Sequence, residues 1–144
     1  LRDPAGLKAT IDRLATPYIG QGIDLVIGIE SRGFILGAPV AERIGAGFIP
    51  IRKPGKLPAQ ALKEIYDLEY GQDALEIHAD AIEKGQRVLI VDDVLATGGT
   101  AAAAVKLVKR LGGDLHGLVF LIELLFLNGK TKLAGEQVHS VLQY

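Results

Sequence analysis

The order of apolar and polar positions predicts a chain in which strands and helices alternate. Apolar residues at helical spacing predict helices from Asp3-Pro4 to about Tyr18, over 34–44 and over 101–111. Short apolar runs rich in β-branched residues predict strands at 24–29, 48–52, 87–91, 115–121 and 138–142. Strands that alternate with helices form a parallel sheet with right-handed crossovers. The predicted fold class is therefore α/β, a parallel sheet flanked by helices.

The segment 53–80 departs from this alternation. Residues 53–60 hold two prolines, a glycine and two lysines, which is typical of an exposed loop. Apolar runs at 62–68 and 75–78, joined through 69–73, predict an antiparallel hairpin. We expect this hairpin to act as a mobile flap beside the sheet. Further along the chain, residues 128–134 predict a short helix.

The stretch 88–100, VLIVDDVLATGGT, carries the strongest functional signal. A buried strand ends in two carboxylates, Asp92 and Asp93, and a Gly/Thr loop leads directly into the helix 101–111. The first N–H groups of a helix have no partner within it, and the helix dipole adds partial positive charge there, so this loop is suited to a phosphate. The two acids instead suit neutral hydroxyls, as on a ribose. Together these features predict a ribose-5-phosphate site.

Individual residues of the loop fit this interpretation. Thr97 and Thr100 supply hydroxyl donors, while Gly98 and Gly99 let the backbone approach a phosphate closely. Two other phosphate motifs fail, because neither the complete Walker A pattern G-x-x-x-x-G-K-[ST] nor the pattern G-x-G-x-x-G occurs in the chain. An acidic strand-to-helix turn that binds no ligand remains an alternative interpretation of the same residues.

Three further segments accompany this stretch: Glu-Ser-Arg-Gly-Phe at 30–34, Ile-Arg-Lys-Pro-Gly-Lys-Leu-Pro at 51–58 and Tyr-Asp-Leu-Glu-Tyr-Gly at 66–71. With the acidic pair and Thr-Gly-Gly-Thr, they resemble the motifs of the type I phosphoribosyltransferases, and most closely those of the adenine phosphoribosyltransferases. The resemblance runs nearly from end to end. It implies a Mg²⁺-dependent transfer of phosphoribose from phosphoribosyl pyrophosphate (PRPP) to adenine, giving AMP and pyrophosphate in purine salvage.

The resemblance also implies roles for particular residues. The phosphate and ribose of PRPP or AMP would be bound by Asp92, Asp93, Ala96, Thr97, Gly98, Gly99 and Thr100. Pyrophosphate would be bound by Glu30, Ser31, Arg32, Arg52, Lys53 and Lys56. A strained or cis peptide is expected at 30–31, and Val94 is expected to lie against the base.

Three residues would act on the reaction itself. Arg32 would stabilise the departing negative charge. Glu69 on the flap would be the acid or base at purine N7, and Tyr70 would help to close the site. The ordinary alternatives are a surface ion pair for Arg32, solvated lysines on the loop 53–60 and an exposed glutamate in a hairpin turn.

Magnesium is implied by the substrate more than by the protein. Mg²⁺ retains several waters and would bridge oxygens of the pyrophosphate and the ribose, so no firm metal ligand is assigned. The histidines His78, His116 and His139 are scattered without metal-ligand spacing and are interpreted as structural.

The composition and net charge of the chain exclude several classes of partner and of chemical site. The chain has 144 residues, and we expect 1–144 to form a single phosphoribosyltransferase domain. A formal net charge of -1 gives no basic field for nucleic acid, and no apolar run is long enough for a membrane span. The lack of cysteine excludes disulfides, thiolate metal sites and a cysteine nucleophile. We expect a cytoplasmic homodimer whose partners are small molecules, with neither a nucleic acid nor a membrane among them.

The chain starts at Leu1 in what reads as continuing sequence. In the family, a preceding segment forms a hood over the base, and we expect this N-terminal hood to be absent here. Besides the enzyme, two alternatives stay open: a non-catalytic PRPP- or nucleotide-binding module of the same fold, and a phosphoribosyltransferase core with weakened base specificity. A receiver-like domain is disfavoured, because the lysine it needs after the strand 115–121 is missing.

Overall fold

The structure is a computed structural model that describes residues 1–144, and its centre is a five-stranded sheet in the order β2-β1-β5-β6-β7. All neighbouring strands in this sheet are parallel, which confirms the predicted fold class. The strands are β1 (Leu25–Ile29), β2 (Gly47–Ile51), β5 (Arg87–Leu95), β6 (Asp114–Glu123) and β7 (Val138–Gln143). The α-helices are α1 (Pro4–Ala15), α2 (Arg32–Ile44) and α3 (Gly99–Arg110), and the 3₁₀ helices are η1 (Thr16–Tyr18), η2 (Leu125–Leu127) and η3 (Gly129–Leu133).

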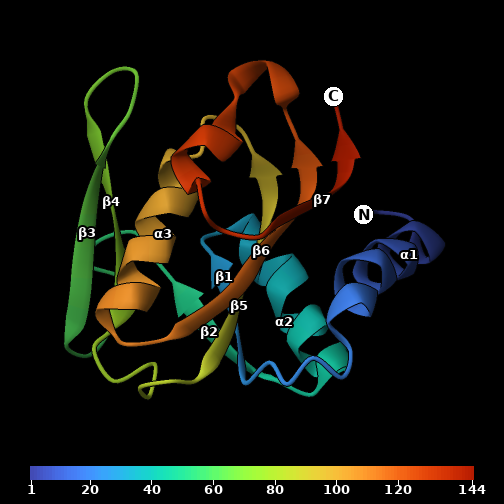
Figure 1. The fold of residues 1–144 in the computed structure, drawn as a ribbon, viewed down its shortest axis with the longest axis horizontal. Helices are drawn as coiled ribbons and strands as arrows, with labels where there is room; N and C mark the ends of the chain where they lie inside the picture. Colours follow the sequence, from blue (N-terminus) through green and yellow to red (C-terminus); the bar gives the residue numbers. More distant parts are fainter.

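Helices cover both faces of the sheet, which explains why its central strands are almost continuously apolar. Figure 1 shows α3 on the left of the sheet and α1 with α2 on the right. Alternate residues of β5 divide between two cores. Val88 and Ile90 belong to the core on the α3 side, whereas Leu89 and Val91 pack with α1 and α2. Because the strands are parallel, the ends of β1, β2 and β5 bring three of the sequence motifs to one edge.

The predicted antiparallel hairpin is confirmed as β3 (Ala61–Asp67) and β4 (Gln72–His78). Its second strand is longer than expected, and its turn occupies 68–71. Leu75 and Ile77 are fully buried in the core on the α3 side. Backbone hydrogen bonds of 2.9 and 2.8 Å between Arg52 and Glu76 tie the hairpin to the end of β2. The hairpin tip projects at the same end of the molecule as the carboxyl ends of the strands (Figure 1).

Two predicted boundaries are wrong near this edge. β5 does not end at residue 91 but continues to Leu95, because β6 pairs with it beyond the acids, with Val94 opposite Ile122. The helix expected at 34–44 begins at Arg32, since the first turn of a helix needs no bond to preceding residues. The short helix expected at 128–134 is confirmed as the 3₁₀ helix η3, which is one residue shorter at each end. Asn128, with a positive φ of 51°, separates it from η2.

The start of α1 follows its sequence signal. Asp3 precedes the helix, and its Oδ2 accepts a hydrogen bond of 2.6 Å from the Gly6 N–H. Pro4 occupies the first turn, where its missing N–H costs nothing. None of the helices combines the length and the apolar character needed to cross a membrane.

Candidate active site

The loop after β5 forms a small cup at the start of α3. The cup encloses about 70 Å³ and is lined by Asp92, residues 94–101 and Phe120. The N–H groups of Gly99, Thr100 and Ala101 belong to the first turn of α3 and have no acceptor within the helix. The volume of the cup and its several free backbone N–H groups therefore suit one phosphoryl group.

Close packing fixes the shape of this cup. Gly98 has a φ of 80°, and a Cβ at this position would lie 2.3 Å from the carbonyl oxygen of Gly129. A Cβ on Gly129 would in turn lie 2.2 Å from the carbonyl oxygen of Ala96. The glycine at 98 is thus required by both backbone and space. The supporting contact from η3 was missed, because Gly129 lies in a segment with no recognised motif.

A larger cavity adjoins the cup and has a volume of about 530 Å³. It is lined by Glu30, Ser31, Arg32, Lys53, Asp92, Asp93, Val94, Ala96 and Thr100. Asp92, Val94, Ala96 and Thr100 line both spaces. Two connected compartments of unequal size therefore lie at the carboxyl ends of the strands, where parallel sheets place their ligands.

The two acids of β5 have different surroundings. Asp92 is half-buried, and its Oδ1 accepts a hydrogen bond of 3.0 Å from the Asp93 N–H. A Cβ on Gly33 would lie 2.9 Å from the same oxygen, so the start of α2 presses closely on this carboxyl group. Burial raises the pKa of Asp92 to about 7, and the nearby charge of Asp93 adds to the effect. Asp92 can therefore change its charge near neutral pH.

Asp93 instead forms an ion pair with Arg32. The Arg32 Nε donates to Asp93 Oδ2, and the arginine side chain is 70% exposed. This contact could not be predicted from the sequence, because it joins the ends of two strands that are neighbours only in the sheet. A sugar hydroxyl that binds Asp93 must compete with Arg32. The peptide bond between Glu30 and Ser31 is cis, as the family resemblance predicted.

Glu30 contacts three cationic residues of the loop after β2, namely Arg52, Lys53 and Lys56. Its Oε2 accepts a hydrogen bond of 2.9 Å from the Lys53 N–H and lies 3.4 Å from Arg52 Nε, while Oε1 accepts from Lys56 Nζ. Burial favours the neutral acid, but these partners outweigh it and lower the pKa of Glu30. Of the four predicted cations, only Arg32 and Lys53 line the larger cavity, whereas Arg52 and Lys56 turn toward Glu30.

Lys53 is also held by the hairpin. Its Nζ donates to Asp73 and lies 3.3 Å from the hydroxyl of Tyr66, which also receives a hydrogen bond of 3.2 Å from Thr100 Oγ1. Burial alone would lower the pKa of Lys53, but the hydrogen bonds to Asp73 and Tyr66 raise it. Neither hairpin residue was predicted. Tyr66 could have been noticed as the first residue of the motif at 66–71.

The structure does not bring Glu69 and Tyr70 into either compartment. Both lie at the hairpin tip, and Tyr70 is 92% exposed. Glu69 lines a separate cavity of about 390 Å³, whose walls also include Thr97 and Lys132. Since Thr97 also lines the cup, this cavity shares a wall with it. A role for Glu69 in the larger cavity would require the tip to move.

A metal ion would find few ready ligands in this site. No group of three or more His, Asp or Glu side chains is arranged to hold one. Asp93 faces the cavity but is engaged with Arg32. A hard cation such as Mg²⁺ would therefore depend on oxygens of a bound phosphate compound and on water.

Comparison with known proteins agrees with this arrangement. The family model described as the phosphoribosyl transferase domain matches residues 3–136. The adenine phosphoribosyltransferase of Koribacter versatilis is 58% identical over 144 residues, which cover 100% of this chain and 79% of that protein. The crystal structure of adenine phosphoribosyltransferase from Thermoanaerobacter pseudethanolicus superposes with a TM-score of 0.96 at 51% identity, covering 99% of this chain and 83% of that one. A Trypanosoma brucei adenine phosphoribosyl transferase in complex with AMP, pyrophosphate and ribose-5-phosphate superposes with a TM-score of 0.90 at 29% identity, covering 99% and 66% of the two chains.

Proposed function

Because this chain belongs to the phosphoribosyltransferase family and its relatives are adenine phosphoribosyltransferases, we propose that it transfers phosphoribose from PRPP to adenine, giving AMP and pyrophosphate. One observation supports this most directly. A cup suited to a phosphate opens into a larger cavity lined by acids and cations, and both share the wall formed by Asp92, Val94, Ala96 and Thr100. PRPP has the matching order of groups, with a 5-phosphate, a ribose diol and a pyrophosphate.

Each part of PRPP has a place in this scheme. The 5-phosphate binds in the cup to the first N–H groups of α3 and to Thr97 and Thr100. The diol lies at the junction, where its hydroxyls donate hydrogen bonds to Asp93 once Arg32 has turned away. The freed guanidinium and Lys53 then bind the pyrophosphate. Substrate thus replaces the internal ion pair by two contacts of its own.

The reaction exchanges one bond at C1 of the ribose for another. The purine N9 forms the new bond, the bond from C1 to the pyrophosphate oxygen breaks, and its electron pair leaves with the pyrophosphate. The proton that adenine carries on N7 passes to Glu69, the proposed base, as N9 forms its bond. Arg32 and Lys53 favour this step because their charges face the oxygens on which negative charge grows. Val94 lies at the shared wall, where its apolar side chain can contact the base.

Glu69 is proposed as the acid or base at purine N7, with Tyr70 closing over the site. In the structure Glu69 lines another cavity and Tyr70 is exposed at the hairpin tip. The role therefore includes an inward movement of the hairpin tip, which also excludes water from the reactive carbon.

Mg²⁺ is proposed to enter bound to the pyrophosphate of PRPP. Its chemistry there is to neutralise the charge of the leaving group. Asp92 and Asp93 line the same cavity, and their contact with the ion would be through water or the diol.

We also propose that the chain forms a homodimer. Large apolar side chains such as Ile35 and Phe126 are 56% and 72% exposed, and a second copy would cover such surface. Light scattering coupled to gel filtration measures the mass in solution, and a monomer at micromolar concentration would contradict this proposal.

Calorimetric titration tests the binding scheme. PRPP with Mg²⁺ and AMP should bind, and GMP should bind more weakly than AMP. Equal affinities for AMP and GMP would remove the adenine assignment and favour a core with weakened base specificity.

A turnover assay separates the enzyme from a non-catalytic module. The chain supplied with PRPP, Mg²⁺ and adenine should release pyrophosphate, whereas a module would bind PRPP and release none. Glu69→Gln should lower kcat by about 10²-fold or more. Glu83→Gln, an exposed glutamate in a turn away from the site, is the matched control and should not change it.

A further inference from the structure

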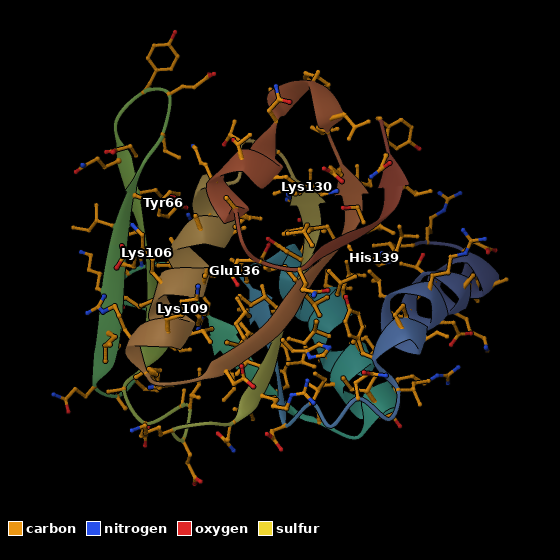
Figure 2. The ribbon with its side chains drawn as sticks, in the orientation of Figure 1. Tyr66, Lys106, Lys109, Lys130, Glu136 and His139 are labelled. Carbon is orange, nitrogen blue, oxygen red and sulfur yellow. The ribbon has the colours of Figure 1, made fainter.

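Tyr66 lies where the hairpin meets the start of α3. Figure 2 shows its side chain between β3 and the N-terminal end of α3. The ring is half-buried, and a Cβ on Gly99 would lie 3.4 Å from it. One neighbour of its hydroxyl, Thr100, belongs to both compartments, and another, Lys53, lines the larger cavity. The hydroxyl therefore stands between the two proposed binding sites.

This hydroxyl uses its full hydrogen-bonding capacity. A phenol donates one hydrogen bond and accepts two. The Lys53 ammonium can only donate, and the ionised Asp73 carboxylate can only accept, at 3.3 and 3.2 Å from the Tyr66 oxygen. Tyr66 must therefore donate to Asp73. The third bond, 3.2 Å long, must then carry the proton of Thr100 toward Tyr66.

The direction of that third bond has a consequence for phosphate binding. A threonine hydroxyl has a single proton, and a phosphate oxygen offers only acceptors. Thr100 must therefore release Tyr66 before it can donate to a phosphate in the cup. Once it has done so, the Tyr66 oxygen retains Lys53 as its only donor.

When Thr100 turns from Tyr66 to the phosphate, the contact between Lys53 and Tyr66 is strengthened. Its ammonium has three N–H groups, of which two are directed to Tyr66 and Asp73. A stronger bond to Tyr66 holds the ammonium more firmly beside the larger cavity, which Lys53 lines, and leaves its third N–H for a ligand. Ordering a side chain before a ligand arrives lowers the entropy cost of binding.

We propose that Tyr66 is a positioning residue whose hydroxyl couples phosphate binding in the cup to pyrophosphate binding in the larger cavity, through Thr100 on one side and Lys53 on the other. The inference rests on the proposed function, since it takes the two compartments to hold the two phosphorylated ends of PRPP. The coupling is positive, and each ligand tightens the other by the same factor.

The test measures pyrophosphate affinity by calorimetry in Mg²⁺ buffer, with and without saturating ribose 5-phosphate. In the unmodified chain, ribose 5-phosphate should tighten pyrophosphate binding roughly threefold to tenfold, the range of one neutral hydrogen bond. Tyr66→Phe keeps the ring and removes the hydroxyl, so this factor should fall close to one. Thr100→Val should remove the factor as well, while Thr100→Ser, which keeps the hydroxyl, should retain it. Tyr18→Phe, which removes a tyrosine hydroxyl outside the site, is the matched control.

The outcomes separate this inference from the proposed function. If both ligands bind and Tyr66→Phe retains the full factor, the coupling role of Tyr66 is wrong and the proposed function stands. A factor of one or below in the unmodified chain overturns the coupling in the same way. If neither ligand binds, the proposed function and this inference fail together. Should Tyr66→Phe not fold, the comparison of Thr100→Val with Thr100→Ser decides.

Discussion

Replacing Asp92 by asparagine should make the protein more stable above neutral pH and change how its stability depends on pH. The carboxyl group is confined by the start of α2, and burial raises its pKa from 3.8 to about 7. Between these two values the folded chain binds more protons at Asp92 than the unfolded chain does. The contribution of Asp92 is therefore fully present below about pH 4 and is lost as the pH rises to about 7.

The size of this loss follows from the shift. One pKa unit corresponds to about 1.4 kcal/mol, so a shift from 3.8 to about 7 sets an upper limit of about 4 kcal/mol. Asp92 also lines the larger cavity, where water reduces the cost of burying its charge. We therefore expect Asp92 to lower the unfolding free energy by about 2–4 kcal/mol once it is ionised. An asparagine has nearly the same shape, and its oxygen can still accept from the Asp93 N–H.

Urea denaturation at pH 4, 6 and 8 measures the effect. The difference in unfolding free energy between Asp92→Asn and the unmodified chain isolates Asp92, because every other titrating group is common to both. This difference should grow in favour of Asp92→Asn by about 2–4 kcal/mol from pH 4 to pH 8. A difference that stays constant over this range would refute the argument that Asp92 is ionised at a cost in the folded protein.

Further predictions concern the cup and the contacts around it. Gly98→Ala should lower the unfolding free energy by about 2–4 kcal/mol, because its Cβ meets a carbonyl oxygen at 2.3 Å, whereas Gly20→Ala, with a similar φ and open space, should cost only about 1 kcal/mol. Equal losses in urea denaturation would show that packing at the cup is unimportant. Lys130→Met should cost about 2–3 kcal/mol, because it removes the ammonium 2.8 Å from the buried Glu123, and Glu123→Gln in the same chain should recover part of the loss. A double variant as unstable as Lys130→Met alone would contradict this explanation. Asp93→Asn should weaken PRPP binding about tenfold or more in calorimetry, and an unchanged affinity would mean that Asp93 does not bind the diol.

Local patterns in the sequence determined much of the fold. Strand and helix alternate over most of the chain, and a parallel sheet is the way in which such units pack, so the sheet and its helices could be predicted. The segment 61–78 does not follow the alternation of strand and helix, and its two apolar runs joined by a turn predicted the hairpin. The boundaries were less certain, because the partner strand β6 and not the local sequence extends β5 to Leu95.

The sequence by itself determined the loop and helix start that form most of the cup, because these are consecutive residues. The packing of Gly129 against Gly98, which fixes the shape of the cup, was decided by the tertiary structure. Only the tertiary structure decided the pairing of Arg32 with Asp93, the turning of Arg52 and Lys56 toward Glu30, and the contact of Tyr66 with Thr100. These contacts join residues that come together through the order of the strands and the docking of the hairpin on α3. The spacing of apolar residues along the chain carries no information about the order of the strands in the sheet. That order is fixed by how the apolar faces of strands and helices pack against one another.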